Sequence, residues 1–229
     1  MKLTWYGHAC FLIEGKKRVL IDPFLTGNPY APIKPSEVKT DIIVVTHGHG
    51  DHLGDTVEIA KNCDAQVICI HELSRILSKQ GVETVGMNIG GTVTSSGISI
   101  TMVQALHSAD VEDETGQIIS AGTAVGVILN IDGTKIYHTG DTDVFLDMQL
   151  IGELHNPEIM LVPIGDVYTM GIAGAVKALE LVKPKIAIPM HYNTFPLIEK
   201  DPNDFKKAVE AKGLDTKVVI LNPGETFEY

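Results

Sequence analysis

The sequence predicts an α/β protein in which two packed β-sheets are flanked by helices. Short strand-like runs come first and follow one another as a meander, whereas later strand-like runs alternate with helical patterns. This order is typical of two sheets with helices outside them. No linker of disordered composition interrupts the 229 residues, a length within the range of one large α/β domain. We therefore expect residues 1–229 to form a single domain.

The first half of the chain is expected to contain most of the meander. Apolar and β-branched runs predict strands, and an apolar period near 3.6 residues predicts helices. The expected strands are 2–6, 10–14, 18–22, 42–45, 67–70, 82–85, 92–94 and 98–103. The expected helices are 54–62 and 72–80, and Gly81 terminates the second. The proline-rich segment 26–35 cannot form regular structure and is expected at the surface near the functional site.

The second half begins with an acidic segment, 108–122, which we expect to be a loop that contacts the substrate. A hairpin is predicted next, because strands 124–131 and 135–138 flank the turn signal Asp132-Gly133. Helices and buried strands then alternate to the end of the chain. The expected helices are 144–154, 171–182 and 203–212, and the expected strands are 159–163, 185–189 and 218–221.

The composition describes a folded, acidic protein with a net charge of −11 at pH 7. The basic residues form no block beyond 16–18, which argues against a nucleic-acid partner. No apolar run approaches a membrane span, and the N-terminus lacks the core of a signal peptide. Cys10, Cys63 and Cys69 form no Cys-x-x-Cys pair, so we expect small buried hydrophobes in a reducing compartment. These features predict a cytoplasmic protein without a membrane partner.

A cluster of histidines stands out at 46–52, where the sequence reads Thr-His-Gly-His-Gly-Asp-His after an apolar run. The pattern His-x-His-x-Asp-His should arise by chance in roughly one such chain in a thousand. Imidazole and carboxylate groups suit zinc, iron or manganese. His47, His49 and Asp51 share a face if the strand continues. His52 then needs a turn, for which the two intervening glycines supply freedom. The cluster predicts a metal site.

Other polar residues follow strand-like runs far along the chain. His107, Asp141 and His191 each come soon after a predicted strand, and so do His8 and Asp22. Sites in α/β folds form at the carboxyl ends of strands. We therefore expect these residues to meet the histidine cluster at one edge of the molecule.

Taken together, this order of residues resembles the metallo-β-lactamase superfamily. The superfamily has an αββα sandwich fold, and its hallmark is His-x-His-x-Asp-His followed by a lone His, an Asp and a last His. Three further stretches resemble its metal-dependent hydrolase branch, which is akin to the ascorbate-6-phosphate lactonases. They are 5–14 (Trp-Tyr-Gly-His-Ala-Cys-Phe-Leu-Ile-Glu), 20–24 (Leu-Ile-Asp-Pro-Phe) and 190–192 (Met-His-Tyr).

The resemblance implies two divalent metal ions, with zinc favoured and manganese or iron as alternatives. His47, His49 and His107 would hold one ion, and Asp51 and His52 would hold the other together with a last histidine. That histidine is His191, and Asp141 would bridge the two ions. Two such ions could share a hydroxide, because they would lower the pKa of the bound water to about 7. Counting that hydroxide and both carboxylates, the site carries a charge of about +1, which would accept an anionic substrate.

The residues around the ligands carry weaker signals. The expected catalytic residues are Asp51, Asp141 and His8. His8 is expected either to contact substrate or give a proton to the leaving group, or to be structural. Asp22 resembles a residue that orients the histidine loop, or it is a turn residue. His138 is expected behind the ligands or in the core. After the strand 159–163, Asp166 and Tyr168 are expected to face the pocket, with a helix N-cap as the alternative for Asp166.

The leading functional hypothesis is a dinuclear metal-dependent hydrolase, in which a metal-bridging hydroxide attacks a small ester, lactone or phosphodiester. A thioester substrate stays open. One alternative is a metal-dependent phosphodiesterase or nuclease, and another is a non-catalytic metal-binding protein. The resemblance also makes a homo-oligomer possible, because relatives of this type are often oligomeric.

Overall fold

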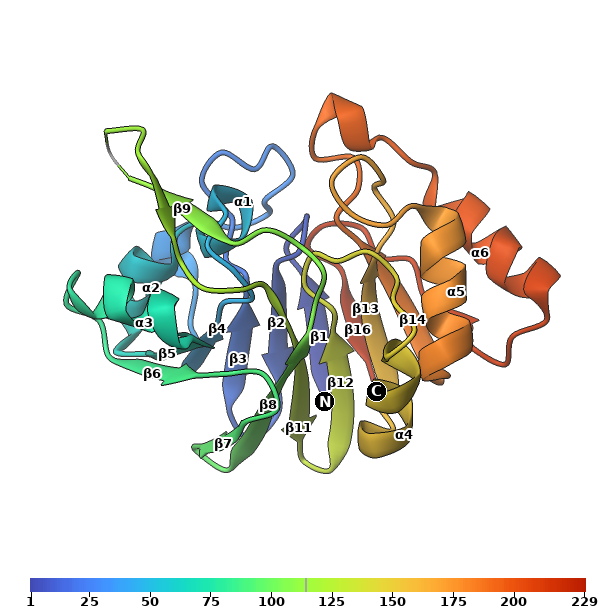
Figure 1. The fold of residues 1–229 in the computed structure, drawn as a ribbon, viewed down its shortest axis with the longest axis horizontal. Coiled ribbons are helices and arrows are strands. Elements are labelled where there is room, and N and C mark those ends of the chain that lie inside the picture. Colours follow the sequence, from blue (N-terminus) through green and yellow to red (C-terminus); the bar gives the residue numbers. More distant parts are fainter. Residues whose placement is uncertain (114) are drawn as a thin grey trace.

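Two seven-stranded β-sheets form the centre of the protein, for which a computed structural model describes residues 1–113 and 115–229 (Figure 1). The first sheet has the order β16-β1-β2-β3-β4-β5-β6, and the second has the order β15-β14-β13-β12-β11-β8-β7. Helices lie on the outer sides, with α2 and α3 beside the first sheet and α4, α5 and α6 beside the second. The αββα arrangement expected from the sequence is confirmed.

The first sheet is antiparallel from β16 to β3 and parallel from β3 to β6. Its strands are β1 (Lys2–Trp5), β2 (Phe11–Glu14), β3 (Arg18–Ile21), β4 (Ile42–Val44), β5 (Gln66–Ile70), β6 (Thr84–Met87) and β16 (Thr226–Glu228). Its helices are α1 (Gly50–Leu53), α2 (Thr56–Cys63) and α3 (His71–Ser78), with a 3₁₀ turn, η1, at Pro35–Glu37.

The second sheet is antiparallel from β7 to β12 and parallel from β12 to β15. Its strands are β7 (Thr92–Ser95), β8 (Ile98–Gln104), β11 (Val125–Ile131), β12 (Thr134–His138), β13 (Ile159–Pro163), β14 (Ile186–Met190) and β15 (Lys217–Val218). Its helices are α4 (Met148–His155), α5 (Ile172–Val182) and α6 (Pro202–Lys212), with a second 3₁₀ turn, η2, at Pro196–Ile198.

The core lies between the sheets and under the helices as one continuous apolar cluster. Phe11, Ile43 and Ile68 come from the first sheet, and Leu129 and Tyr137 come from the second; all five are fully buried. The parallel strands β4 and β13 are buried at every position, as expected for strands covered on both faces.

Strand direction places the functional loops together. In the first sheet β1, β3 and β4 run the same way, and in the second sheet β8, β12, β13 and β14 do so. The loops that follow these strands gather at the upper edge of the molecule in Figure 1. Side chains that follow those strands therefore meet there, as the strand-end argument predicted.

The two ends of the chain lie side by side at the opposite edge (Figure 1). The Met1 amino group donates to the Tyr229 carbonyl at 3.1 Å, and the Tyr229 amide donates to the Met1 carbonyl at 3.0 Å. Strand β16 closes the first sheet by pairing with β1, with Phe227 opposite Leu3. The sequence did not predict β16, because its three residues, Thr-Phe-Glu, contain no apolar run.

Several expected elements differ from the structure. The acidic segment 108–122 contains a two-stranded hairpin, β9 (Asp110–Glu112) and β10 (Ile118–Ser120), rather than only loop; its Glu114 lies outside the described residues. The helix expected at 144–154 begins only at Met148. Before it, Asp143 accepts from the Val144 amide at 2.7 Å, and such local bonds compete with a helix. Along the described ranges, no helix is both long and apolar enough to cross a membrane.

Candidate metal centre

The histidine cluster begins as β4 ends and continues into α1. His49 precedes this short helix, and the turn of the helix brings His52 round to the side of His47. Gly48 and Gly50 do not adopt positive φ, so the expected conformational freedom is not what the motif uses. Gly48 is instead needed for space, because a Cβ there would lie 2.8 Å from the Asp110 carbonyl oxygen of β9.

The three distant ligand candidates reach this cluster from the second sheet. His107 follows β8, Asp141 follows β12 and His191 directly follows β14. All seven expected ligands therefore gather in one place, in two groups. The first group is His47, His49 and His107, whose candidate ligand atoms lie within 4.8 Å of one another. The second group is Asp51, His52 and His191, whose candidate ligand atoms meet the same limit and are joined by His8.

Asp141 lies between the two groups and contacts both. Its Oδ1 is 3.2 Å from His52 Nε2, and its Oδ2 is 2.9 Å from His191 Nε2 and 3.6 Å from His107 Nε2. The carboxylate is almost fully buried. Burial alone would raise its pKa, but the attraction of His191 and His52 outweighs burial and holds the pKa of Asp141 well below its usual range.

The donor atoms of the centre fit bound cations. Among the described residues, most of the buried polar side-chain atoms without a well-formed hydrogen bond lie here: His52 Nε2, Asp141 Oδ1 and both ring nitrogens of His191. The two rings approach the carboxylate closely but form no such bond with it. Leaving such atoms unpaired in the interior costs about 1–3 kcal/mol each. A divalent ion would satisfy His52 Nε2, Asp141 Oδ1 and one ring nitrogen of His191. The all-nitrogen-and-oxygen donor set suits zinc, manganese or iron.

Asp22 holds the histidine loop from behind. Its Oδ1 accepts from the Thr46 amide at 2.8 Å, and its Oδ2 accepts from the Thr46 hydroxyl at 2.7 Å. His52 Nδ1 lies 2.8 Å from the same Oδ2, which directs His52 Nε2 toward Asp141. Burial opposes ionisation of Asp22, yet His52 keeps its pKa below the ordinary value. Asp22 therefore contacts the candidate ligand His52 rather than serving only as a turn residue.

His8 and His138 lie on two different sides of the centre. His8 is 1% exposed, and its Nε2 lies 3.1 Å from Asp51 Oδ2. Burial, reinforced by the nearby His191, lowers the pKa of His8 to about 4. His138 is fully engaged with the backbone, since its Nε2 lies 2.9 Å from the Ala9 carbonyl and its Nδ1 accepts from the Gly140 amide. His138 is therefore in the core behind the ligands.

A cavity of about 440 Å³ opens over the two groups. Tyr168 lines it, as expected, with half of its surface exposed. Asp166 turns away, where it pairs with Lys200 at 3.4 Å; it does not cap α5, whose N-cap is Gly171. The lining is completed by candidate ligands, by Ser108 from the segment expected to contact the substrate, and by Phe195, which sequence reasoning missed. The full lining is His49, Asp51, His107, Ser108, Asp141, Tyr168 and Phe195.

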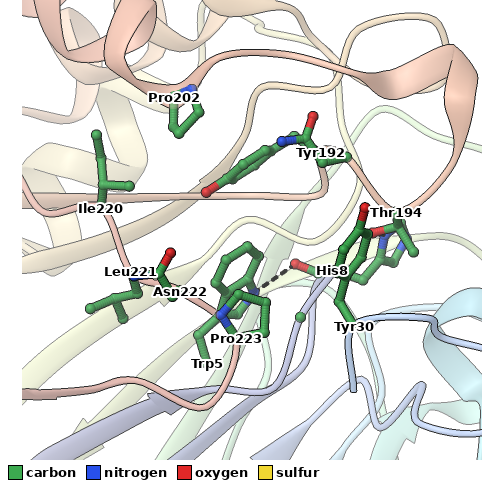
Figure 2. A pocket seen from close by; sticks show the side chains of 12 residues that line it. Trp5, His8, Tyr30, Tyr192, Thr194, Pro202, Ile220, Leu221, Asn222 and Pro223 are labelled. Carbon is green, nitrogen blue, oxygen red and sulfur yellow. Dashed lines mark hydrogen bonds between the residues drawn. The ribbon is translucent and has the colours of Figure 1, made fainter. Parts of the chain in front are cut away.

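A second, smaller cavity of about 200 Å³ lies on the other side of His8 (Figure 2). Trp5 and Tyr192 form its aromatic wall, with ring centroids 5.4 Å apart. Thr194 and His8 lie at one side of it in Figure 2. Thr194 and Phe195 thus lie on opposite sides of one short segment, since Phe195 lines the larger cavity. Their signal in the sequence is only that they closely follow His191.

Comparison with known proteins places this geometry in a family. The model of the β-lactamase superfamily domain matches residues 2–191. The chain belongs to the metallo-β-lactamase superfamily. A metal-dependent hydrolase from Archaeoglobus fulgidus is 73% identical over all of this chain and 99% of its own length. One from Methanosarcina mazei is 54% identical over all of this chain and 98% of its own length.

Solved structures agree with this placement. A metallo hydrolase from Ignicoccus hospitalis is 41% identical and superposes with a TM-score of 0.89, covering 100% of this chain and 98% of that one. A metallo-β-lactamase fold protein from Bacillus subtilis has a TM-score of 0.73 at 14% identity, covering 99% and 98% of the two chains. The second likeness shows the fold alone. Because the relatives of this chain are named metal-dependent hydrolases, they support the same general activity for this member of the superfamily.

Proposed function

We propose that this protein is a dinuclear metal-dependent hydrolase of small esters, lactones or phosphodiesters. The observation that carries the proposal is the position of Asp141, which touches ligand candidates of both groups from between them. The second group and Asp141 supply the buried donor atoms that lack a hydrogen-bond partner, and the three clustered histidines of the first group support another ion beside them. Relatives named metal-dependent hydrolases at 54% and 73% identity support hydrolysis.

The residues would divide the work as follows. The first group would hold one ion and the second group the other, with Asp141 bridging them; zinc is the favoured ion. Bound divalent ions supply a nucleophile near neutral pH, by lowering the pKa of water to about 7, and they polarise an electrophilic oxygen. Asp51 lines the cavity and faces the substrate side. Proton delivery by His8 stays a prediction, and its burial behind Asp51 favours a positioning role instead.

The cavity supports a small substrate with an apolar portion. Tyr168 and Phe195 present aromatic surface beside the ligands, and Ser108 offers a hydroxyl. Two bound divalent ions would make the site locally positive within an acidic chain, so an anionic ester fits the charge. We propose no nucleic-acid partner, because the chain has 18 basic residues against 29 acidic ones.

An assay of the metal-loaded protein tests the function. We expect turnover of at least one of three substrate classes: bis-p-nitrophenyl phosphate, p-nitrophenyl esters and lactones. Asp141→Ala should abolish this turnover, because the bridging carboxylate is lost. Elemental analysis should find two ions per chain. Two bound ions with no turnover in any class would favour the non-catalytic alternative, whereas tight, salt-sensitive RNA binding would favour the nuclease.

A further inference from the structure

The main chain of His8 is fixed more firmly than an ordinary turn residue. Its carbonyl oxygen accepts from Trp5 Nε1 at 2.9 Å and from the His191 amide at 3.0 Å. Its φ is 52°, in the left-handed region, which costs a residue with a side chain free energy and persists only where the surroundings impose it. The fold therefore holds His8 in one strained position beside His191.

The ring of His8 is held at both nitrogens. Its Nδ1 lies 2.8 Å from Thr194 Oγ1, and its Nε2 lies 3.1 Å from Asp51 Oδ2. An ionised carboxylate can only accept, whereas a hydroxyl can donate or accept. In a neutral imidazole, the proton must therefore lie on Nε2 and be donated to Asp51. The Nδ1 lone pair then accepts from the Thr194 hydroxyl.

This chain of hydrogen bonds approaches Asp51 from behind. Of the described residues, those lining the larger cavity include Asp51 but neither His8 nor Thr194. His8 and Thr194 line the smaller cavity beside Trp5 instead (Figure 2). A side chain in this position cannot reach a substrate over the metal ligands without displacing Asp51. It can, however, fix the direction in which the Asp51 carboxylate points.

We propose that Thr194 and His8 are positioning residues that orient Asp51 toward the second metal ion, through the relay Thr194 Oγ1–H to His8 Nδ1 and His8 Nε2–H to Asp51 Oδ2. Groups that hold a ligand in this way typically change metal affinity by 10–100-fold when they are lost. The inference rests on the proposed dinuclear function, because it concerns only the second ion.

Variants separate the relay from simple packing. Thr194→Val keeps the shape and removes the hydroxyl, and Thr194→Ser restores it. His8→Ala removes the ring, whereas His8→Gln keeps a side-chain N–H donor that does not ligate metal. The matched control is Thr216→Val, since Thr216 is also buried and its hydroxyl donates to the Pro184 carbonyl at 2.7 Å, outside the metal centre.

The measurement is the affinity of each ion, obtained by titrating metal-free protein with zinc and cobalt(II). Cobalt absorption and elemental analysis count the bound ions. Thr194→Val and His8→Ala should weaken the binding of the second ion by about 10–100-fold and leave the binding of the first ion unchanged. Thr194→Ser and His8→Gln should recover most of the loss, and Thr216→Val should bind both ions as the wild type does.

Four outcomes would overturn the inference in distinguishable ways. A wild-type chain that binds only one ion refutes the dinuclear function and the relay together. A wild-type chain with two ions, and variants that bind both equally tightly, refutes the relay alone. Full metal content with a lowered kcat in His8→Ala assigns proton delivery to His8 instead. If His8→Gln loses as much affinity for the second ion as His8→Ala does, while Thr194→Val loses none, His8 is a direct ligand.

Discussion

At the scale of residues, the proposed centre divides into candidate ligands for each of two ions and one carboxylate, Asp141, that lies between them. The division yields a pattern of metal content. His47→Ala or His49→Ala should empty mainly the first position, and Asp51→Ala or His52→Ala mainly the second. Asp141→Ala should weaken both, because its two oxygens face both groups. Elemental analysis after dialysis tests this pattern, and equal loss of both ions in every variant would contradict it.

A second residue-scale prediction concerns Asp22. Asp22→Asn keeps the size of the side chain but turns an N–H donor toward a site where Thr46 and His52 also donate. His52 should then lose its fixed orientation, and the second ion should bind about 10–100-fold more weakly. Metal titration measures this effect. Asp41→Asn is a useful control, because Asp41 also accepts from a backbone amide, that of Arg18 at 2.8 Å, outside the metal centre. Unchanged affinity in Asp22→Asn would assign Asp22 a purely structural role.

At the scale of elements, the histidine loop approaches β9 closely at Gly48 but not at Gly50, so alanine substitutions at these two glycines test the contact. Gly48→Ala would place its Cβ 2.7 Å from Val111 Cγ2 and 2.8 Å from the Asp110 carbonyl. Relieving this overlap should lower the free energy of unfolding by about 1–3 kcal/mol, because the β9–β10 hairpin or the histidine loop must be displaced. Gly50→Ala is the control, because nothing lies within 4 Å of its added Cβ.

Denaturant unfolding of the metal-free variants gives the comparison. Gly48→Ala should unfold at a lower denaturant concentration than the wild type, whereas Gly50→Ala should not. Metal titration of the same proteins should show weaker binding in the first group, since Gly48 separates two of its ligands. Equal stability in both variants would mean that the contact with β9 is looser than its geometry indicates.

The elements also show where sequence reasoning succeeds. Strand β13, with five apolar residues in succession, was predicted with its exact bounds, because a covered parallel strand has an unbroken apolar pattern. Helix α1 and the hairpin strands β9 and β10 were missed, since none of them contains the run of three successive apolar residues that marks the equally short strand β4. The gathering of the candidate ligands in one place could be predicted because each of them follows a predicted strand. Thr194 and Phe195 could not, because only the folded loop after β14 brings them to the centre.

At the scale of the whole molecule, the C-terminal strand supports a site that it does not touch. The Gly224 amide donates to the Trp5 carbonyl at 2.7 Å, and β16 pairs along β1, the strand that leads to His8. Removing residues 223–229 should therefore lower the melting temperature. The truncation should also weaken the binding of the second ion more than that of the first, because Trp5 helps to hold His8. A truncated protein that melts and binds metal as the full chain does would refute this coupling.

The contact between the first and last residues gives the molecule a further property. Because Met1 and Tyr229 exchange two hydrogen bonds, a short linker could join them and close the backbone into a ring. New ends could then be opened in the exposed β7–β8 turn at Ser96-Gly97, which lies at the opposite end of β8 from His107. Circular permutation succeeds at such sites. The permuted chain would bring the same residues to the metal centre, although it would begin and end at the β7–β8 turn.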